Sequence, residues 1–430
     1  MFWEKEIETI SSSDLKKLQL IKLHHTIEKA KKSDYYKKIL KKTKISTLKD
    51  IESLPFTSKQ DLRDHFPYGL LAEDLTESVR LHSSSGTTGN PTVVFHTKED
   101  IELWADLVAR CMYMTGVRKH DVFQNTMGYG LFTGGLGFHY GAEKLGMLTI
   151  PVGPGNSKRQ IWFMQQFSTT AVHILPSYAI HLYSSFQELS LDPKKDTRLK
   201  TAFIGAEPHT NALRVQIENL YGIKAYNSYG LSEMCGPGVA FECPQQNGMH
   251  IWEDHFYVEI IDPKTGQILP DGEEGELVLT TLKRSAMPLI RYRTRDLTRI
   301  INEPCLCGRT HRRIERIKGR SDDMLIINGV NIFPMQIEQT VMQFPGVGNN
   351  YRIEILKENH MDRINVLIEV HEEIFNGTLS KLDQLKNQII EALKSECGVT
   401  PKVKLVEPES LPINEGKAVR VFDMRRNEEE

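Results

Sequence analysis

The chain has 430 residues, which at roughly 150 residues per domain corresponds to two or three domains. Hydrophobic residues make up 40% of it and charged residues 26%, a composition typical of a folded globular protein and not of a disordered chain. Lysine and arginine (54) nearly balance aspartate and glutamate (56), and the formal charge of -2 excludes a general attraction to nucleic acid or anionic membrane, so we expect a small-molecule partner.

The first helical stretch is expected within residues 15–44, where eleven lysines alternate with apolar residues in a roughly helical rhythm. We interpret these lysines as the solvated face of a helix, with an anion-binding arm as the alternative. No signal-peptide region precedes the stretch, and no run of 18 apolar residues occurs anywhere. Six cysteines are too few for a disulfide framework, so we expect a cytoplasmic protein.

The segment SVRLHSSSGTTGNPTVVFHT places two extended runs, 79–82 and 92–97, around a loop of hydroxyl residues and glycines. Hydroxyl and backbone N–H donors that approach an anion closely suit a polyphosphate, so we interpret the loop as phosphate-binding, with a flexible hairpin as the alternative. The Walker A pattern is absent. The loop comprises Ser83, Ser84, Ser85, Gly86, Thr87, Thr88 and Gly89.

The middle of the chain alternates predicted strands at 147–152, 171–175 and 201–204 with predicted helices at 159–167 and 210–220. This alternation predicts α/β layers with largely parallel sheets. From about residue 255, turn residues between alternating apolar runs predict a smaller β layer. The last part, about 110 residues long, has an α+β pattern that includes a helix at 379–395.

Four further motifs carry charged residues suited to nucleotide chemistry. Glu233 in YNSYGLSEMCGPG offers hard oxygens to magnesium. Asp296 in RYRTRD has two oxygens that can accept hydrogen bonds from both hydroxyls of a ribose. Arg320 and Asp322 lie in IKGRSDDM, and Lys417 follows a glycine in LPINEGKAVR.

Together these motifs, in this order, resemble the adenylate-forming superfamily of acyl-CoA synthetases, adenylation domains and luciferases, and more closely its phenylacetate-CoA ligase family. The resemblance extends over nearly the whole chain and includes GYGLFTGGLGFHYGAEKLG at 128–146, IPVGPGNSKRQ at 150–160 and WEDHFYVEI at 252–260. It implies an α/β fold, with a large N-terminal adenylation domain of layered sheets and helices (1–319) and a small, mobile α+β C-terminal domain (320–430).

The resemblance also implies roles for individual residues. The loop from Ser83 to Gly89 would bind ATP phosphates, Glu233 would bind magnesium and act in catalysis, and Lys417 would be the catalytic lysine. Asp322 would be the hinge. The remaining nucleotide-binding residues would be Gly205, Ala206, Glu207, Tyr229, Gly230, Asp296 and Arg320, and Gly329, Val330 and Asn331 would line the coenzyme A tunnel.

The activity implied is ATP-dependent ligation of phenylacetate, or another aryl-acetate, to coenzyme A in phenylacetate catabolism. Acyl-AMP would form with release of pyrophosphate, and acyl-CoA would then form with release of AMP. The cofactors would be ATP, Mg²⁺ and coenzyme A, and a homodimer is a family-level expectation. An adenylation enzyme that uses another aromatic acid, or that transfers to a carrier-protein thiol, stays open as the alternative.

An acyl pocket is predicted where aromatic residues occur among glycines, because glycines beside aromatic side chains leave room for a flat ring. Ordinary core packing around a Gly-rich turn is the alternative. The pocket residues are Tyr129, Phe132, Gly134, Phe138 and Tyr140. The phosphate loop departs from the family's Gly-Lys-Pro ending, because Asn90 stands in place of the lysine and cannot neutralise a phosphate. We therefore expect weaker nucleotide affinity.

Three thiols and an imidazole, Cys243, His250, Cys305 and Cys307, are the ligand types of a tetrahedral structural zinc. Their spacings are less usual than paired CxxC motifs, so free reduced thiols are the alternative, and His311 is a substitute ligand. A metal-stabilised nucleic-acid binder is disfavoured by the near-zero net charge. A serine hydrolase is disfavoured because the segment around Ser232 lacks the GxSxG elbow.

Overall fold

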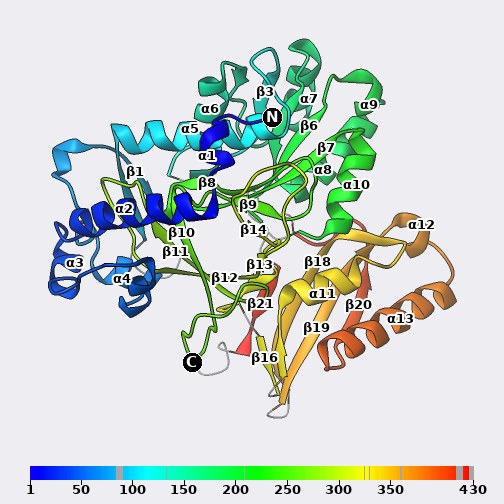
Figure 1. Ribbon diagram of the computed structural model, residues 1–430. Helices are drawn as coiled ribbons and strands as arrows, with labels where there is room; N and C mark the ends of the chain where they lie inside the picture. The colour runs from blue at the N-terminus through cyan, green and yellow to red at the C-terminus, as the bar shows by residue number, and fades with distance from the viewer. Residues whose placement is uncertain are drawn as a thin grey trace. The chain divides into compact units, whose positions relative to one another are not determined.

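The structure is a computed structural model (Figure 1), and it describes residues 1–83, 91–131, 133–207, 209–323, 325–328, 330–358, 361–412 and 420–425. The chain forms two compact units. The first comprises Met1–Leu175, Ser185–Ala206 and Leu220–Ile317, and the second comprises Pro176–Ser184, Glu207–Asn219 and Lys318–Glu430. Among the residues described, no helix is both long enough and apolar enough to cross a membrane.

A nine-stranded sheet forms the centre of the first unit, in the order β13-β14-β9-β8-β7-β6-β5-β3-β4. The strands from β7 to β4 in this order are parallel, whereas β7, β8, β9, β14 and β13 pair antiparallel. The predicted parallel layer is therefore confirmed. The strands are β3 (Val122–Asn125), β4 (Leu148–Ile150), β5 (Ala171–Ile174), β6 (Thr201–Gly205), β7 (Lys224–Leu231), β8 (Gly236–Glu242), β9 (Met249–Ile251), β13 (Ile300–Ile301) and β14 (Arg313–Ile314).

The helices predicted at 159–167 and 210–220 are confirmed as α7 (Ser157–Gln166) and α10 (Asn211–Tyr221). Among the helices that were not predicted, the longest in the described residues are α5 (Lys98–Met114), α6 (Thr133–Leu145) and α8 (Pro176–Glu188). The short helix α9 (Pro193–Asp196) follows α8.

Helix α6 forms despite its many glycines, which normally disfavour helices. A Cβ atom at Gly141 would lie 2.6 Å from Cγ1 of Val108, and one at Gly137 would lie 2.5 Å from Cγ of Pro237. These two glycines let α6 pack closely against α5 and β8. They are therefore explained by packing within the protein and not by room for a substrate ring.

The lysine-rich stretch forms α2 (Ser12–Ala30) and α3 (Asp34–Ile39), separated where the Ser33 side chain caps α3. Helix α2 buries Leu15, Leu23 and Ile27, while Lys16 and Lys17 are exposed. The predicted solvated lysine face is confirmed. The other short N-terminal elements are α1 (Lys5–Glu8), η1 (Leu48–Ser53), α4 (Lys59–Asp64) and η2 (Leu75–Glu77).

Two smaller β structures complete the first unit. Strands β1 (Ser78–Ser83) and β2 (Val93–Thr97) form an antiparallel ribbon and border, in the sequence, the segment predicted to bind phosphate. The predicted turn-rich β layer is confirmed, because β10 (Phe256–Ile261), β11 (Gly275–Thr281) and β12 (Tyr292–Thr298) pair antiparallel in sequence.

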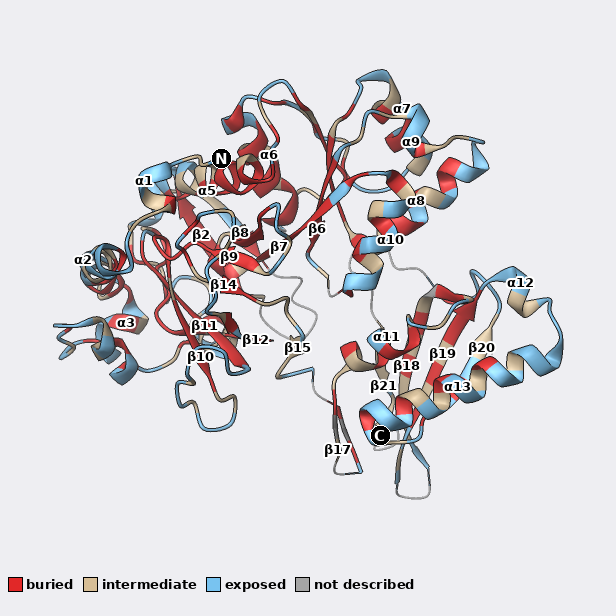
Figure 2. Ribbon diagram, turned by 45° about the vertical axis from the view of Figure 1, so that its right-hand side comes forward, coloured by how far each residue is buried: buried red, intermediate tan, exposed pale blue. Residues whose placement is uncertain are grey.

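The second unit has its own α+β core. Strands β18 (Val347–Glu358) and β19 (Met361–Val370) form an antiparallel pair that is extended by β20 (Lys402–Val406) and β21 (Val421–Asp423). The predicted helix at 379–395 is α13 (Leu379–Cys397), whose Leu385, Ile389 and Leu393 are buried. Figure 2 shows α13 with both buried and exposed segments along its length. Its other elements are β15 (Gly319–Arg320), β16 (Leu325–Ile327), β17 (Val330–Ile332), α11 (Pro334–Val341) and α12 (Glu372–Phe375).

Candidate functional site

Two predicted nucleotide-binding residues meet directly although they are far apart in the sequence. The hydroxyl of Tyr229, on β7, donates a hydrogen bond of 2.6 Å to Oδ2 of Asp296, on β12. Both side chains are only 8% exposed. A buried carboxylate needs such donors, so this contact fixes the position of Asp296.

The glycines at the carboxyl ends of β6 and β7 are required by close backbone contacts. A Cβ atom at Gly205 would lie 2.3 Å from the carbonyl oxygen of Ser228, and one at Gly230 would lie 1.9 Å from that of Gly236. Ala206 follows with a φ of +64°. In open parallel sheets, ligands bind outside the carboxyl ends of the strands, so these predicted residues lie at the expected edge.

Glu207 and Glu233 have different surroundings. The carboxylate of Glu207 accepts hydrogen bonds from the backbone N–H and the hydroxyl of Ser177, at 2.6 and 3.0 Å. Glu233 lies in the short helix η3 (Ser232–Met234), and its backbone oxygen accepts a 2.5 Å hydrogen bond from Arg284.

The carboxylate of Glu233 is the predicted magnesium ligand. The residue is 6% exposed. Carboxylate oxygens are the ligands that a hard cation such as magnesium prefers.

Several predicted site residues lie outside the described residues. Ser83, the first residue of the predicted phosphate loop, is described. It ends β1, is buried, and its backbone N–H donates to the carbonyl of Leu131 at 3.0 Å. The predicted residues outside the described ranges are Ser84, Ser85, Gly86, Thr87, Thr88, Gly89, Phe132, Gly329 and Lys417, together with Asn90. Val330 and Asn331 lie in β17.

Arg320 and Asp322, predicted to hold the ribose and to act as the hinge, form an ion pair with each other. The Arg320 guanidinium donates from Nε and Nη2 to the two carboxylate oxygens of Asp322, both at 2.8 Å. The side chains are 34% and 50% exposed, so solvent weakens the pair. This pairing was not predicted from the sequence.

The predicted acyl-pocket aromatics occupy unlike environments. Phe138 is fully buried, with its ring centroid 3.8 Å from that of His173 and 5.3 Å from that of Phe203. Core packing, the alternative, therefore describes Phe138 better. Tyr140 accepts a 2.9 Å hydrogen bond from Arg80, and Gly134 is buried in α6.

Tyr129 is partly exposed and follows β3 at the same sheet edge as Gly205. Its hydroxyl lies 3.0 Å from Nδ2 of Asn125 and 3.3 Å from Nδ1 of His139. The contact with His139 was missed, although a tyrosine, a histidine and a glutamate at 129, 139 and 143 are a polar signal in an otherwise apolar stretch.

The predicted metal ligands converge. The ligand atoms of Cys243, His250, Cys305 and Cys307 all lie within 4.8 Å of one another. Sγ of Cys243 is 3.6 Å from Sγ of Cys305, and Sγ of Cys307 is 3.2 Å from Nε2 of His250. A hydrogen bond from Cys243 holds the pKa of the Cys307 thiol well below its usual range. Three sulfurs and one nitrogen in this arrangement match a structural zinc site.

His311 supports the cluster but is not a ligand, which corrects its prediction as a substitute ligand. Its backbone oxygen accepts from Nδ1 of His250 at 2.9 Å, which leaves the lone pair of His250 on Nε2, facing the thiols. The ring of His311 accepts from the backbone N–H of Glu253 at Nδ1 and donates to the carbonyl of Ile7 from Nε2, both at 2.9 Å. Both ring nitrogens are therefore occupied.

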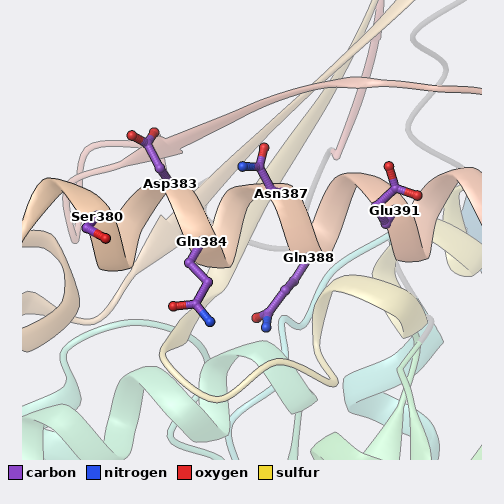
Figure 3. Close-up of a pocket in the computed structure, with 6 residues that line it drawn as sticks. All are labelled: Ser380, Asp383, Gln384, Asn387, Gln388 and Glu391. Atoms are coloured by element: carbon purple, nitrogen blue, oxygen red, sulfur yellow. The ribbon is translucent and has the colours of Figure 1, made fainter.

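A hollow on the second unit is lined by six polar side chains of α13 alone (Figure 3): Ser380, Asp383, Gln384, Asn387, Gln388 and Glu391. Their spacing of three or four residues places them on one face of the helix, opposite its buried leucines and isoleucine. None of the predicted site residues lines this hollow.

Comparison with known proteins gives consistent matches. The model of the AMP-binding enzyme family matches residues 16–283, and that of the AMP-binding enzyme C-terminal domain matches residues 329–425. The phenylacetate-coenzyme A ligase of Thermus thermophilus is 43% identical over 99% of this chain and 100% of its own length. The Escherichia coli enzyme of the same name is 42% identical over 97% of each chain.

Among solved structures, 2-hydroxyisobutyryl-CoA ligase in the postadenylation state, in complex with 2-HIB-AMP, matches with a TM-score of 0.93. The two sequences are 30% identical, and the match covers 99% of this chain and 93% of that one.

Proposed function

The chain belongs to the AMP-binding enzyme family, and from this membership we propose that it is an ATP-dependent phenylacetate:coenzyme A ligase, an AMP-forming acid-thiol ligase. The observation that carries the proposal is the identity of 42% and 43% with two phenylacetate-coenzyme A ligases over nearly the full chain. The pairing of Tyr229 with Asp296 and the position of Glu233 in η3, directly after β7, support a nucleotide site. Coenzyme A and reduced thiols suit the cytoplasm, where we place the reaction.

In the first half-reaction, a carboxylate oxygen of the acid attacks the α-phosphorus of ATP, and the bond to pyrophosphate breaks. The product is a mixed anhydride, acyl-AMP. Because two anions must approach each other, the reaction requires positive charge and hydrogen-bond donors around the phosphates. We assign these roles to Lys417 and to the loop from Ser83 to Gly89.

Tyr229 and Asp296 orient the nucleotide in this proposal. Asp296 accepts a hydrogen bond from the Tyr229 hydroxyl, and in this proposal its carboxylate also accepts from a ribose hydroxyl. Gly205 and Gly230 keep the strand ends free of side chains where the adenine would lie. Magnesium, when bound, would neutralise phosphate charge, and Glu233 would be its protein ligand.

In the second half-reaction, the sulfur of coenzyme A attacks the carbonyl carbon of acyl-AMP and AMP leaves. The roles proposed here divide the chain into an adenylation domain, 1–319, and a mobile domain, 320–430. Rotation about Asp322 would withdraw Lys417 and bring Gly329, Val330 and Asn331 towards the thiol. The exposed ion pair between Arg320 and Asp322 would have to exchange partners during this movement.

We place the aryl group of the acid beside Tyr129 and Tyr140, with Phe132 and Gly134 as further lining residues. Both tyrosines are partly exposed and carry polar contacts, unlike the fully buried Phe138. An aromatic ring offers substrate contact without charge, which suits phenylacetate.

We also propose that Cys243, His250, Cys305 and Cys307 bind a structural zinc. The ligands come from the end of β8, from β9 and from the loop between β13 and β14, so the ion would connect three segments at one edge of the nine-stranded sheet. Four protein ligands close the coordination shell, which is typical of a structural and not a catalytic zinc.

The decisive experiment measures release of pyrophosphate and AMP with ATP, magnesium and a panel of carboxylic acids, each with and without coenzyme A. We expect turnover that depends on coenzyme A and is highest with aryl-acetates. Turnover with another acid would overturn the substrate but keep the reaction, whereas no pyrophosphate release with any acid would overturn the reaction.

A further inference from the structure

The hydroxyl of Tyr129 belongs to a chain of polar groups that runs from the protein interior to solvent. His173, Asn125, Tyr129, His139 and Glu143 follow one another along it, with successive distances of 3.2, 3.0, 3.3 and 3.1 Å. His173 is 3% exposed, and the side chain of Glu143 is 53% exposed. The direction of each hydrogen bond decides what Tyr129 offers to a substrate.

The interior end of the chain is fixed by backbone groups. Nδ2 of Asn125 lies 2.7 Å from the carbonyl of Gly135, and its Oδ1 lies 3.2 Å from the N–H of Met127. A carbonyl only accepts and an N–H only donates, so the orientation of this amide is determined. Nδ2 therefore donates to the Tyr129 oxygen, which uses one of the two lone pairs of the hydroxyl.

The solvent end determines the tautomer of His139. Oε1 of Glu143 lies 3.1 Å from Nε2 of His139, and a carboxylate only accepts, so Nε2 carries the proton. A neutral imidazole then has its lone pair on Nδ1, which accepts the proton of the Tyr129 hydroxyl. Burial raises the pKa of Tyr129 to about 12, so the phenol keeps this proton to donate.

One lone pair of the Tyr129 oxygen is left. We propose that His139 and Glu143 are positioning residues that turn Tyr129 into a hydrogen-bond acceptor for the ring of the acid, so that the enzyme favours aryl-acetic acids whose ring carries a hydrogen-bond donor such as a hydroxyl. This inference rests on the proposed function, in which Tyr129 contacts the acyl group. His139 and Glu143 do not touch the substrate themselves.

The test compares hydroxyphenylacetates with methoxyphenylacetates, substituted at each ring position, by kcat/KM for coenzyme-A-dependent AMP release. A hydroxyl donates and accepts, whereas a methoxy group only accepts. The size difference between a hydroxyl and a methoxy group is the same for every enzyme variant. A change in the ratio of kcat/KM for the hydroxy acid to kcat/KM for the methoxy acid (the hydroxy-to-methoxy ratio) therefore reports a change in hydrogen-bond direction. Phenylacetate itself is measured as the reference.

Glu143→Lys is the informative variant, because the ammonium donates to Nε2 of His139 and moves the imidazole proton to Nδ1. His139 then donates to Tyr129, whose own proton becomes available to a methoxy oxygen. We expect the hydroxy-to-methoxy ratio to fall by about three- to tenfold, the effect of one neutral hydrogen bond. Glu143→Gln keeps an acceptor at Nε2 and should keep the ratio, and Glu188→Lys, an exposed charge reversal on α8, is the matched control.

An unchanged ratio in both Glu143→Lys and His139→Phe would overturn the inference. If Glu143→Lys lowered kcat/KM by the same factor with every acid, the inference would also be overturned, because that pattern indicates structural damage and not a reversed hydrogen bond. If Tyr129→Phe left the ratio unchanged while phenylacetate was still ligated, the inference would fail and the proposed function would stand. If the unmodified protein ligated none of these acids, the proposed function itself would fail, and the inference with it.

Discussion

The phenolic oxygen of Tyr229 lies 2.6 Å from Oδ2 of Asp296, so that the hydroxyl aligns the carboxylate proposed to hold the ribose. The contact joins strands that are 67 residues apart in the sequence. The Tyr229 hydroxyl therefore supplies the Asp296 carboxylate with a hydrogen-bond donor.

Removal of this donor should weaken nucleotide binding. Tyr229→Phe leaves a buried carboxylate without that hydrogen bond, which typically costs about 1–3 kcal/mol. We expect the KM for ATP to rise about tenfold while the KM for the acid changes little, measured by pyrophosphate release. Tyr113→Phe, which removes a hydroxyl from a residue on α5, is the control. Equal KM values for ATP in both variants would contradict the role of the pair.

Lys417→Ala should separate the two half-reactions. Loss of a positive charge that stabilises the transition state typically reduces the rate about 100- to 1000-fold, so formation of acyl-AMP should fall by that factor. Thioester formation from supplied acyl-AMP should be largely retained, because the proposed rotation withdraws this lysine. Rapid-quench measurement of the rates of acyl-AMP formation and of thioester formation checks this difference. An equal loss of both rates would refute the role of Lys417 in adenylation.

Glu233→Gln should raise the magnesium requirement. The amide keeps the shape of the side chain but removes the charge that suits a hard cation. We expect the magnesium concentration for half-maximal pyrophosphate release to increase at least about tenfold, with activity recovered at high magnesium. Glu188→Gln, an exposed matched change, should leave this concentration unaltered. A loss of activity that no magnesium concentration restores would argue against the ligand role.

The purified protein should contain one zinc per chain. Cys307→Ser should lose the metal and melt several degrees lower, because metal binding contributes directly to the stability of the fold. Cys397→Ser, in the core of the second unit, should keep its zinc, and so should His311→Gln, since His311 orients His250 through its backbone oxygen. Less than one zinc per chain in a normally folded protein would contradict the proposed zinc site.

A buried ion pair makes stability depend on pH. Arg110 and Asp254, with side chains 0% and 2% exposed, lie 2.9 Å apart. Burial acts to raise the pKa of Asp254, but the charge of the Arg110 guanidinium holds it well below its usual range. A depressed folded-state pKa contributes stability above the unfolded pKa, about 4, and this contribution is lost as the pH falls through the folded pKa.

Arg110→Met leaves this carboxylate buried without its partner, which typically costs about 3–5 kcal/mol. At pH 7 we expect the free energy of unfolding, measured with urea, to be lower by that amount in the variant than in the unmodified protein. This difference should become smaller as the pH falls below about 4. Arg118→Met is the control, because this arginine is also on the first unit and its guanidinium, among the residues described, contacts backbone oxygens, an aromatic ring and a methionine. A deficit independent of pH would show that the loss of packing, and not of charge, dominates.

The sequence predicted the fold where periodicity is strong and failed where packing overrides propensity. The strands β5 and β6 and the helix α13 are confirmed almost to the residue, because buried runs and amphipathic spacing identify them. Helix α6 was missed, since its glycines normally disfavour a helix. Glycine is nevertheless required at 137 and 141, because a side chain at either position would collide with neighbouring residues.

The candidate site was predictable in its residue types and not in its contacts. The Cys and His positions indicated a metal cluster, but His311 could be excluded as a ligand only from the occupancy of its two ring nitrogens. The contact of Tyr129 with His139 depends on the helical course of α6. Sequence spacing alone does not show which groups a tertiary fold brings together.

The loop that carries Cys305, Cys307 and His311 also holds the beginning of the chain, since His311 donates to Ile7 and the neighbouring Arg309 forms a buried ion pair with Glu8. Arg309 and Glu8 are 301 residues apart. A ribosome adds about 5–20 residues per second, so the first residues exist for roughly 15–60 s before their partners are synthesised. During that interval Glu8 lacks the Arg309 guanidinium, so this buried ion pair and the hydrogen bond from His311 to Ile7 form only after nearly three quarters of the chain has been synthesised.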